Sequence, residues 1–154
     1  MMMLAAFKEI INPDVIIDIA TSDKLLILIE NSPESKIREL HIQGVPENSF
    51  AFALEYRPPG KPQKWLKQLS YYVKSDNDIG VNKGCDLILL VPQKNDHWVV
   101  LICELKSDKP KKGDTEKQLL NSELYIRYLM SMVNSYYQPK FNNAKIITRT
   151  MRFF

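Results

Sequence analysis

The chain is poor in the features that mark secreted, membrane-spanning and disulfide-rich proteins. No apolar run approaches the roughly 20 residues that a helix needs to cross a bilayer, so no membrane partner is expected. Residues 1–7 are apolar, but they lack the basic start and cleavage-type site of a signal peptide. The only two cysteines, Cys85 and Cys103, lie in apolar runs, which indicates small buried side chains rather than a disulfide framework. A reduced, cytoplasmic protein is therefore expected.

Histidine and glycine are also scarce, and their placement argues against two kinds of site. His41 and His97 have no Cys or His partner at metal-ligand spacing, so a zinc site is not expected. The five glycines are scattered singly, so the chain lacks a glycine-rich phosphate-binding loop. Use of ATP is not indicated.

The size and charge of the chain fit one globular domain with a basic second half. The 154 residues are 45% apolar and 25% charged, which is ordinary for a domain with a substantial core. The net charge of +3 is uneven: residues 1–78 hold nine Lys and Arg against eleven Asp and Glu, and residues 79–154 hold twelve against seven. A basic half suits a phosphate-rich partner such as nucleic acid.

Apolar periodicity predicts strands through most of the chain and one long helix near its end. Residues 15–20 fit either a strand or a continuation of the first helix, and residues 75–84 are expected to form a loop. The long helix is expected over 115–137, burying Leu119, Leu120, Ile126, Leu129, Met130 and Val133. The other predicted elements are helices at 1–11 and 64–72 and strands at 25–30, 37–43, 49–56, 85–90, 99–106 and 145–154.

Acidic side chains interrupt two of these apolar strands. Asp86 lies near the start of the first strand, and six apolar residues precede Glu104 in the second. Because side chains alternate along a strand, Glu104 and Lys106 point to the same side. Burying a lone carboxylate is costly unless it is paired or binds a metal. We therefore expect Asp86, Glu104 and Lys106 to meet around a divalent cation.

This arrangement resembles the PD-(D/E)XK nuclease superfamily, over roughly residues 83–106 with the following helix and last strand consistent. The resemblance implies an α/β (α+β) fold, the restriction-endonuclease-like mixed β-sheet flanked by helices. It implies that Asp86, Glu104 and the backbone carbonyl of Leu105 hold Mg²⁺, for which Mn²⁺ could substitute, and that Lys106 serves the attacking water. The chain departs from the family pattern at Cys85, where the motif often has proline.

Further site residues are suggested with less specificity. Some exonuclease-type branches of the superfamily carry a Gln and a later Tyr in the helix that follows, and here Gln118 and Tyr125 occupy one helix face. Alternatively, Thr115 and Gln118 form a capping box at the start of that helix. Some members also add an upstream Glu, for which Glu9 and Glu55 are the candidates.

Three basic residues follow the Glu-x-Lys strand directly: Lys109, Lys111 and Lys112. They are candidates for phosphate contacts with a nucleic acid. The alternative is that they form a solvated charged loop without a binding role.

The sequence therefore predicts a single nuclease-like domain, 1–154, with a motif core at 83–154 and a β-rich part at 1–82. The predicted function is a Mg²⁺-dependent nuclease acting on DNA, for which a homodimer is a possible assembly. One alternative is a non-catalytic nucleic-acid- or partner-binding module on the same fold. Another is an unrelated α/β protein in which Glu104 and Lys106 form a surface ion pair.

Overall fold

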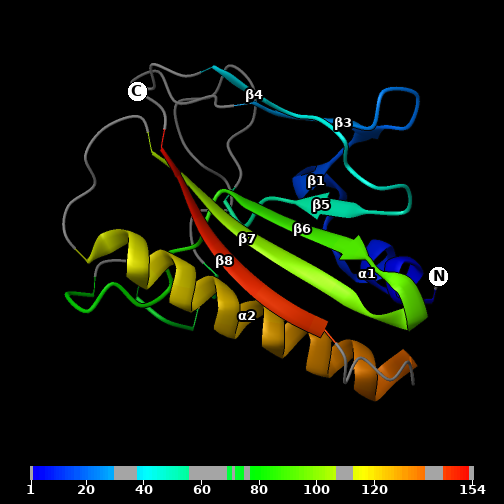
Figure 1. Cartoon of the computed structure of the whole chain (residues 1–154). Helices are drawn as coiled ribbons and strands as arrows, with labels where there is room; N and C mark the ends of the chain where they lie inside the picture. Colours follow the sequence, from blue (N-terminus) through cyan, green and yellow to red (C-terminus); the bar gives the residue numbers. More distant parts are fainter. Residues whose placement is uncertain are drawn as a thin grey trace.

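The computed structural model shows an α+β protein built on a twisted five-stranded sheet (Figure 1). The structure describes residues 2–29, 38–55, 69–70, 72–74, 77–106, 113–137 and 144–152. Its helices and strands are α1 Met2–Ile10, β1 Ile16–Ile17, β2 Ile19–Ala20, β3 Leu25–Ile29, β4 Glu39–Ile42, β5 Phe50–Phe52, β6 Leu87–Pro92, β7 Trp98–Lys106, α2 Asp114–Tyr137 and β8 Ala144–Arg152. Short 3₁₀ turns occupy Pro13–Val15 and Lys94–Asp96.

The large sheet has the strand order β1-β5-β6-β7-β8 and is mixed. Its first four strands pair antiparallel, whereas β7 and β8 are parallel. Parallel neighbours need a crossover connection, and the helix α2 lies in the segment that joins them. A second sheet of three antiparallel strands, β2-β3-β4, lies on the opposite side of the large sheet from α2 (Figure 1).

One face of the large sheet is covered by the two helices. Ile88 and Leu90 of β6 and Val100 and Ile102 of β7 are almost fully buried on this face. They pack with Phe7 of α1, with Phe50 and Phe52 of β5, and with Ile126, Leu129, Met130 and Val133 of α2. The helix pattern predicted for 115–137 is therefore confirmed in its main apolar stripe.

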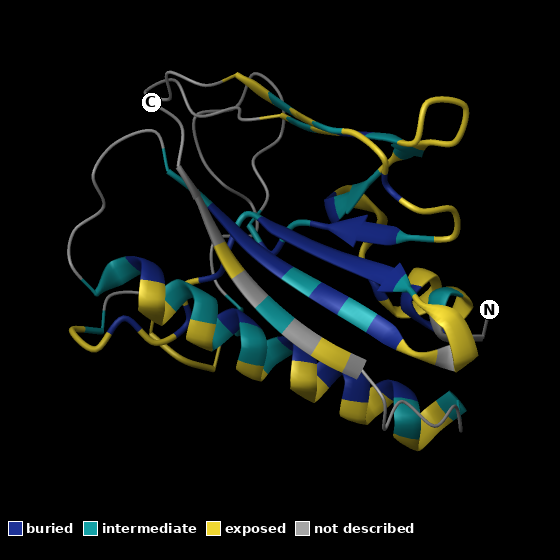
Figure 2. Ribbon diagram, in the orientation of Figure 1, coloured by how far each residue is buried: buried dark blue, intermediate teal, exposed yellow. Residues whose placement is uncertain are grey.

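The other face of β6 and β7 is buried as well. Leu87, Leu89 and Val91 of β6, together with Cys103 of β7, pack against Leu26 and Val45 from the side of the small sheet. Burial on both faces explains the unbroken apolar runs of these two strands, and Figure 2 shows β6 buried along its length. Both cysteines are free and buried, as expected.

Three details differ from the sequence-based predictions or extend them. Within residues 15–20, Val15 ends a 3₁₀ turn, and the two short strands that follow belong to different sheets, with Asp18 between them. Leu120 is 56% exposed and not part of the buried stripe of α2, whereas Ser122 is fully buried there. Of the helix predicted at 64–72, residues 64–68 and 71 lie outside the described part of the chain, and the described Leu69, Ser70 and Tyr72 are not helical. No helix among the described residues is both long and apolar enough to cross a membrane.

Candidate active site

Asp86 lies at the point where the pairing of β6 and β7 ends. The last pair of the ladder joins Leu87 to Cys103, so the backbone N–H of Leu105 lies beyond it. The carboxylate of Asp86 accepts this N–H, with 2.8 Å between Leu105 N and Asp86 Oδ2. In an antiparallel ladder the N–H and C=O of one residue face the same edge of the strand, so the Leu105 carbonyl also faces the β6 side.

Glu104 and Lys106 point to the helix-covered side of the sheet, in step with Ile102. The ammonium of Lys106 lies 2.5 Å from Glu104 Oε1. Glu104 is only 2% exposed, while the side chain of Lys106 is 23% exposed. The pair is therefore a buried carboxylate with a cation at its outer side and not the surface ion pair of one alternative.

Gln118 joins this pair from α2. Its Oε1 accepts a hydrogen bond from the Lys106 ammonium at 3.0 Å, and its Nε2 donates to the Gly84 carbonyl at 3.2 Å. The capping-box interpretation is therefore wrong. The helix begins at Asp114, after Gly113 in a left-handed conformation, and Thr115 lies within its first turn. The Thr115 hydroxyl is buried and has no hydrogen-bond partner among the described residues.

Two further side chains of α2 hold the segment that leads into Asp86. Asn121 Nδ2 donates to the carbonyls of Gly80 and Lys83, at 2.9 and 3.2 Å. The buried hydroxyl of Ser122 accepts the N–H of Cys85 at 2.8 Å and donates to the Gln118 carbonyl. The position of Asp86 thus depends on α2. The sequence alone does not predict that Asn121 takes part in this.

The electrostatics of the site are dominated by the buried Glu104. Burial and the nearby charge of Asp86 raise the pKa of Glu104 from 4.5 to about 7, although Lys106 and Gln118 pull it the other way. Burial also raises the pKa of the Cys85 thiol to about 12. Cys85 is therefore protonated at neutral pH and unsuited to nucleophilic chemistry.

The free energy of unfolding of the metal-free protein should fall as the pH rises from about 4.5 to about 7. In this window the folded protein retains a proton on Glu104 that the unfolded chain has already lost, so raising the pH favours unfolding. This shift of the Glu104 pKa corresponds to a change of about 3 kcal/mol in the free energy of unfolding, at about 1.4 kcal/mol for each pKa unit. Urea unfolding in chelator from pH 4.5 to 8 measures it. The Glu104→Gln variant should lose this part of the pH dependence, and an unchanged profile would contradict the assignment.

The oxygen atoms present fit a hard divalent cation. Glu104 Oε2 is buried and has no hydrogen-bond partner among the described residues, and such an atom is stabilised by a bound cation. Mg²⁺ prefers carboxylate and carbonyl oxygens and retains several waters. Asp86, Glu104 and the Leu105 carbonyl could supply the protein ligands. Waters would complete the shell. The described ranges contain no group of three or more His, Cys, Asp or Glu side chains that could hold a metal.

Of the remaining candidate site residues from the sequence, three are lysines and one is Tyr125. Lys109, Lys111 and Lys112 lie outside the described residues. Tyr125 packs against the core and against the ring of Tyr128, at 6.2 Å between centroids. Among the described residues no hydrogen bond joins Tyr125 to Glu104, Lys106 or Gln118.

The two upstream glutamates differ in their distance from the site. Glu9 lies beside Tyr137, whose pKa is raised by loss of solvation and by the charge of Glu9. Tyr137 ends α2 and is about 28 Å along the helix from Gln118, so Glu9 is not near the site. Glu55 is adjacent to Gly84, since its Cγ would lie 3.8 Å from a Cβ built there. Glu55 is therefore the better candidate of the two.

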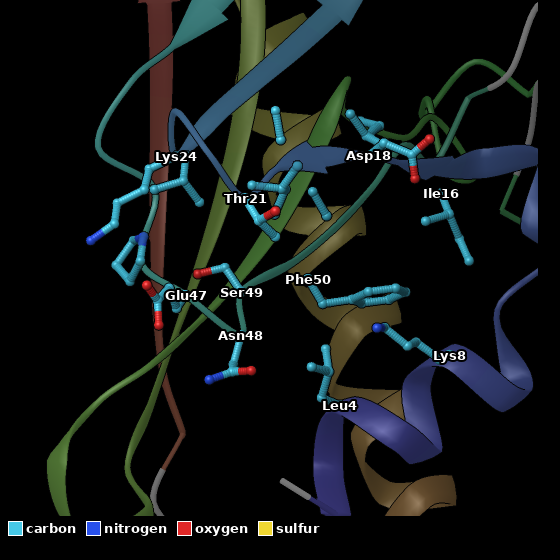
Figure 3. A pocket seen from close by; sticks show the side chains of 16 residues that line it. Leu4, Lys8, Ile16, Asp18, Thr21, Lys24, Glu47, Asn48, Ser49 and Phe50 are labelled. Carbon is cyan, nitrogen blue, oxygen red and sulfur yellow. The ribbon is translucent and has the colours of Figure 1, made fainter.

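A separate cavity of about 640 Å³ lies between α1, the strands β1 and β2, and residues 45–51 (Figure 3). Its wall is largely apolar, with Leu4, Ile16 and Phe50, and side chains of both charges, such as Lys8 and Glu47, lie around it. None of the residues that gather around Glu104 lines this cavity.

The candidate site thus combines two carboxylates, a backbone carbonyl and an ammonium at the ends of two paired strands, with an amide from α2 fixing the ammonium. Such a set can hold a hard cation beside a positively charged donor, which suits reactions that develop negative charge on oxygen. No family model, no curated protein and no solved structure matches this chain.

Proposed function

We propose that this protein is a metal-dependent nuclease that hydrolyses phosphodiester bonds in DNA and has the restriction-endonuclease-like fold. The observation that carries the proposal is the buried Glu104, which has one oxygen on Lys106 and the other without a hydrogen-bond partner among the described residues. Burying such a group is unfavourable for stability alone. A cation bound at this site would offset the cost of burying the carboxylate.

The order of elements supports the proposal. The resemblance implies strand, strand, helix and strand through the last four core elements, and β6, β7, α2 and β8 follow in that order. The upstream helix and strand that the sequence left open are best supplied by α1 and β5. Phe7 of α1 packs against Phe50 and Phe52, and β5 pairs with β6.

Each residue has a distinct role in the proposed chemistry. Mg²⁺ supplies charge neutralisation and an acidic bound water when it is present. Asp86, Glu104 and the Leu105 carbonyl would hold it. Lys106 orients the attacking water or donates to the negative charge that develops on the phosphate. Gln118 acts through Lys106, because its Oε1 accepts from the ammonium while its Nε2 is anchored on the Gly84 carbonyl.

The charge of the chain supports a nucleic-acid substrate. The excess of Lys and Arg lies in residues 79–154, the half that contains the site. Lys109, Lys111 and Lys112 follow Lys106 directly in sequence, and we propose that they contact phosphates. The two free, buried cysteines are compatible with work in the reducing cytoplasm.

Cleavage of nucleic acids with and without divalent cations tests the proposal. Supercoiled plasmid and labelled single- and double-stranded DNA and RNA are incubated with Mg²⁺, Mn²⁺, Ca²⁺ or chelator. We expect DNA cleavage with Mg²⁺ or Mn²⁺, none with chelator, and a melting temperature raised by the cations. Binding of DNA without cleavage under any of these conditions would instead favour the non-catalytic binding module.

A further inference from the structure

The cavity beside α1 lies where the chain passes from one sheet to the other. Ile16 and Ile17 pair with β5 of the large sheet, and Ile19 and Ala20 pair with β3 of the small sheet. Asp18 separates the two pairs of residues. The two sheets and α1 leave between them a space of about 640 Å³, which is within the range of small-molecule sites, roughly 300–1,000 Å³.

The wall of the cavity is continuous with the packed interior of the protein. Phe50 belongs to the core on the helix-covered face of the large sheet, and Val45 and Ala51 belong to the core on its other face. Leu4 and Ile16 are partly buried and extend the apolar wall toward the opening. Such a wall favours an apolar body over water, because covering it removes apolar surface from solvent.

Backbone hydrogen bonds hold residues 45–49, one side of the cavity, in place. The N–H of Val45 donates to the Lys24 carbonyl at 2.9 Å, and the N–H of Ser49 donates to the Pro46 carbonyl at 3.2 Å. Asn48 adopts a left-handed φ of 62°, a conformation that asparagine tolerates better than most residues. A ligand would therefore bind without having to order this wall, which lowers the entropic cost of binding.

The charged side chains around the cavity differ in direction. Figure 3 shows the Lys8 side chain reaching from α1 toward the ring of Phe50, whereas the Lys24 side chain extends away from the cavity. The Lys8 ammonium has no hydrogen bond or ion pair within the described part of the chain. An apolar wall beside one unpaired ammonium fits a ligand that joins an apolar body to an anionic group.

Two carboxylates restrict how much negative charge such a ligand can carry. Asp18 and Glu47 are exposed and border the cavity, and Figure 3 shows their carboxylates at its two sides. They would repel further anionic groups placed along the wall, because like charges in one site oppose each other. The cavity therefore suits a molecule with a single anionic group near Lys8 and disfavours a polyanion.

We propose that this cavity is a binding site for a small amphipathic anion. The ligand has a compact apolar body of one or two rings, which lies against Leu4, Ile16 and Phe50, and a single anionic group that accepts a hydrogen bond from the Lys8 ammonium. The proposal does not rest on the proposed nuclease activity, because none of the residues that gather around Glu104 lines the cavity.

Fluorescence titration with two matched probes tests the site, in chelator so that no cation takes part. Anilinonaphthalene sulfonate carries one anionic group on aromatic rings, and phenylnaphthylamine has the same rings without the charge. We expect the sulfonate to bind at tens of micromolar. Lys8→Met should weaken it about tenfold, the loss expected for one charge-assisted hydrogen bond, and should leave the neutral probe unaffected.

Lys24→Met is the matched control, because it removes a lysine of the same cavity whose side chain extends away from it. This variant should bind both probes as the parent does. A parent that does not bind the sulfonate would overturn the proposal. So would a Lys8→Met variant that leaves sulfonate binding unchanged, or an equal loss in Lys24→Met, which would indicate only general attraction between charges.

Filling the cavity tests where the probes bind, with the probes excited outside the tryptophan absorption. Thr21 and Ala20 are exposed and border the cavity, so Thr21→Trp and Ala20→Trp should each fold and should each abolish binding of both probes. A melting temperature close to that of the parent checks that each variant is folded. Lys106→Met should bind both probes as the parent does, since Lys106 does not line the cavity. Binding that survives in the folded tryptophan variants would place the probes elsewhere and overturn the proposal.

Discussion

Replacing Glu104 by glutamine is expected to abolish Mg²⁺-dependent cleavage while making the metal-free protein more stable. The amide keeps the shape of the side chain, but it cannot supply the negative charge that holds the cation, so the cleavage rate should fall at least 10³-fold, roughly the loss of about 4 kcal/mol of transition-state stabilisation. At pH 8 the variant should gain about 1–3 kcal/mol in free energy of unfolding, because the cost of ionising a buried carboxyl is removed.

Single-turnover cleavage and urea unfolding in chelator measure the two effects in the same preparation. The matched control is Glu123→Gln, which removes a half-buried, ion-paired carboxylate from α2 and should change neither cleavage nor the response to Mg²⁺. Mg²⁺ should raise the melting temperature of the parent and of the control but not of Glu104→Gln. A variant that loses activity and stability together would show that Glu104 has only a structural role.

Replacing Lys106 by methionine is expected to reduce the chemical step by about 10²–10³-fold, the effect of losing one preorganised donor. Methionine retains most of the aliphatic length of lysine and removes only the charge, so the packing beside Gln118 should be preserved. Binding of Mg²⁺ should persist, because Lys106 is not a ligand and its removal lowers the positive charge near the cation. Nucleic-acid affinity should change little, since it comes from phosphate contacts spread over the basic half.

Single-turnover rates at saturating Mg²⁺, together with DNA binding in Ca²⁺, separate chemistry from affinity. The control is Lys117→Met, which removes an exposed lysine one residue before Gln118 and should leave the chemical step unchanged. If Lys106→Met cleaves at the parent rate, this set of residues does not perform the proposed hydrolysis. Nucleic-acid binding without catalysis would then be the better explanation of the fold.

Much of the architecture and of the central site follows from local pattern. The apolar runs of β6 and β7 predict strands buried on both faces, and the alternation of side chains places Glu104 and Lys106 together. Asp86 joins them because the two strands are neighbours in the chain and form a hairpin. These predictions need only the spacing of the apolar residues, the length of each apolar run and the cost of burying a charge.

The contributions of α2 to the site could not be predicted in the same way. Gln118 fits both a capping box and a site residue, and the choice depends on partners 12 and 34 residues away in sequence. Asn121 bonds backbone groups 41 and 38 residues away, and no local signal marks such contacts. Helical spacing also predicts burial of Leu120, and this prediction is wrong. Spacing shows that a helix has an apolar face more reliably than it shows how wide that face is.

The bonds from α2 to residues 80–85 also set the order in which the parts of the candidate site can come together. During synthesis, residues 86–106 leave the ribosome before α2 does. Until α2 docks, the described bonds that hold Gly80, Lys83, Gly84 and Cys85 to that helix are missing. The segment that leads into Asp86 then lacks its anchors on α2, although the bond from the Leu105 N–H to Asp86 lies within the two paired strands. Under the proposed function, a chain that ends before α2 is expected to be inactive, because docking of α2 completes the candidate site.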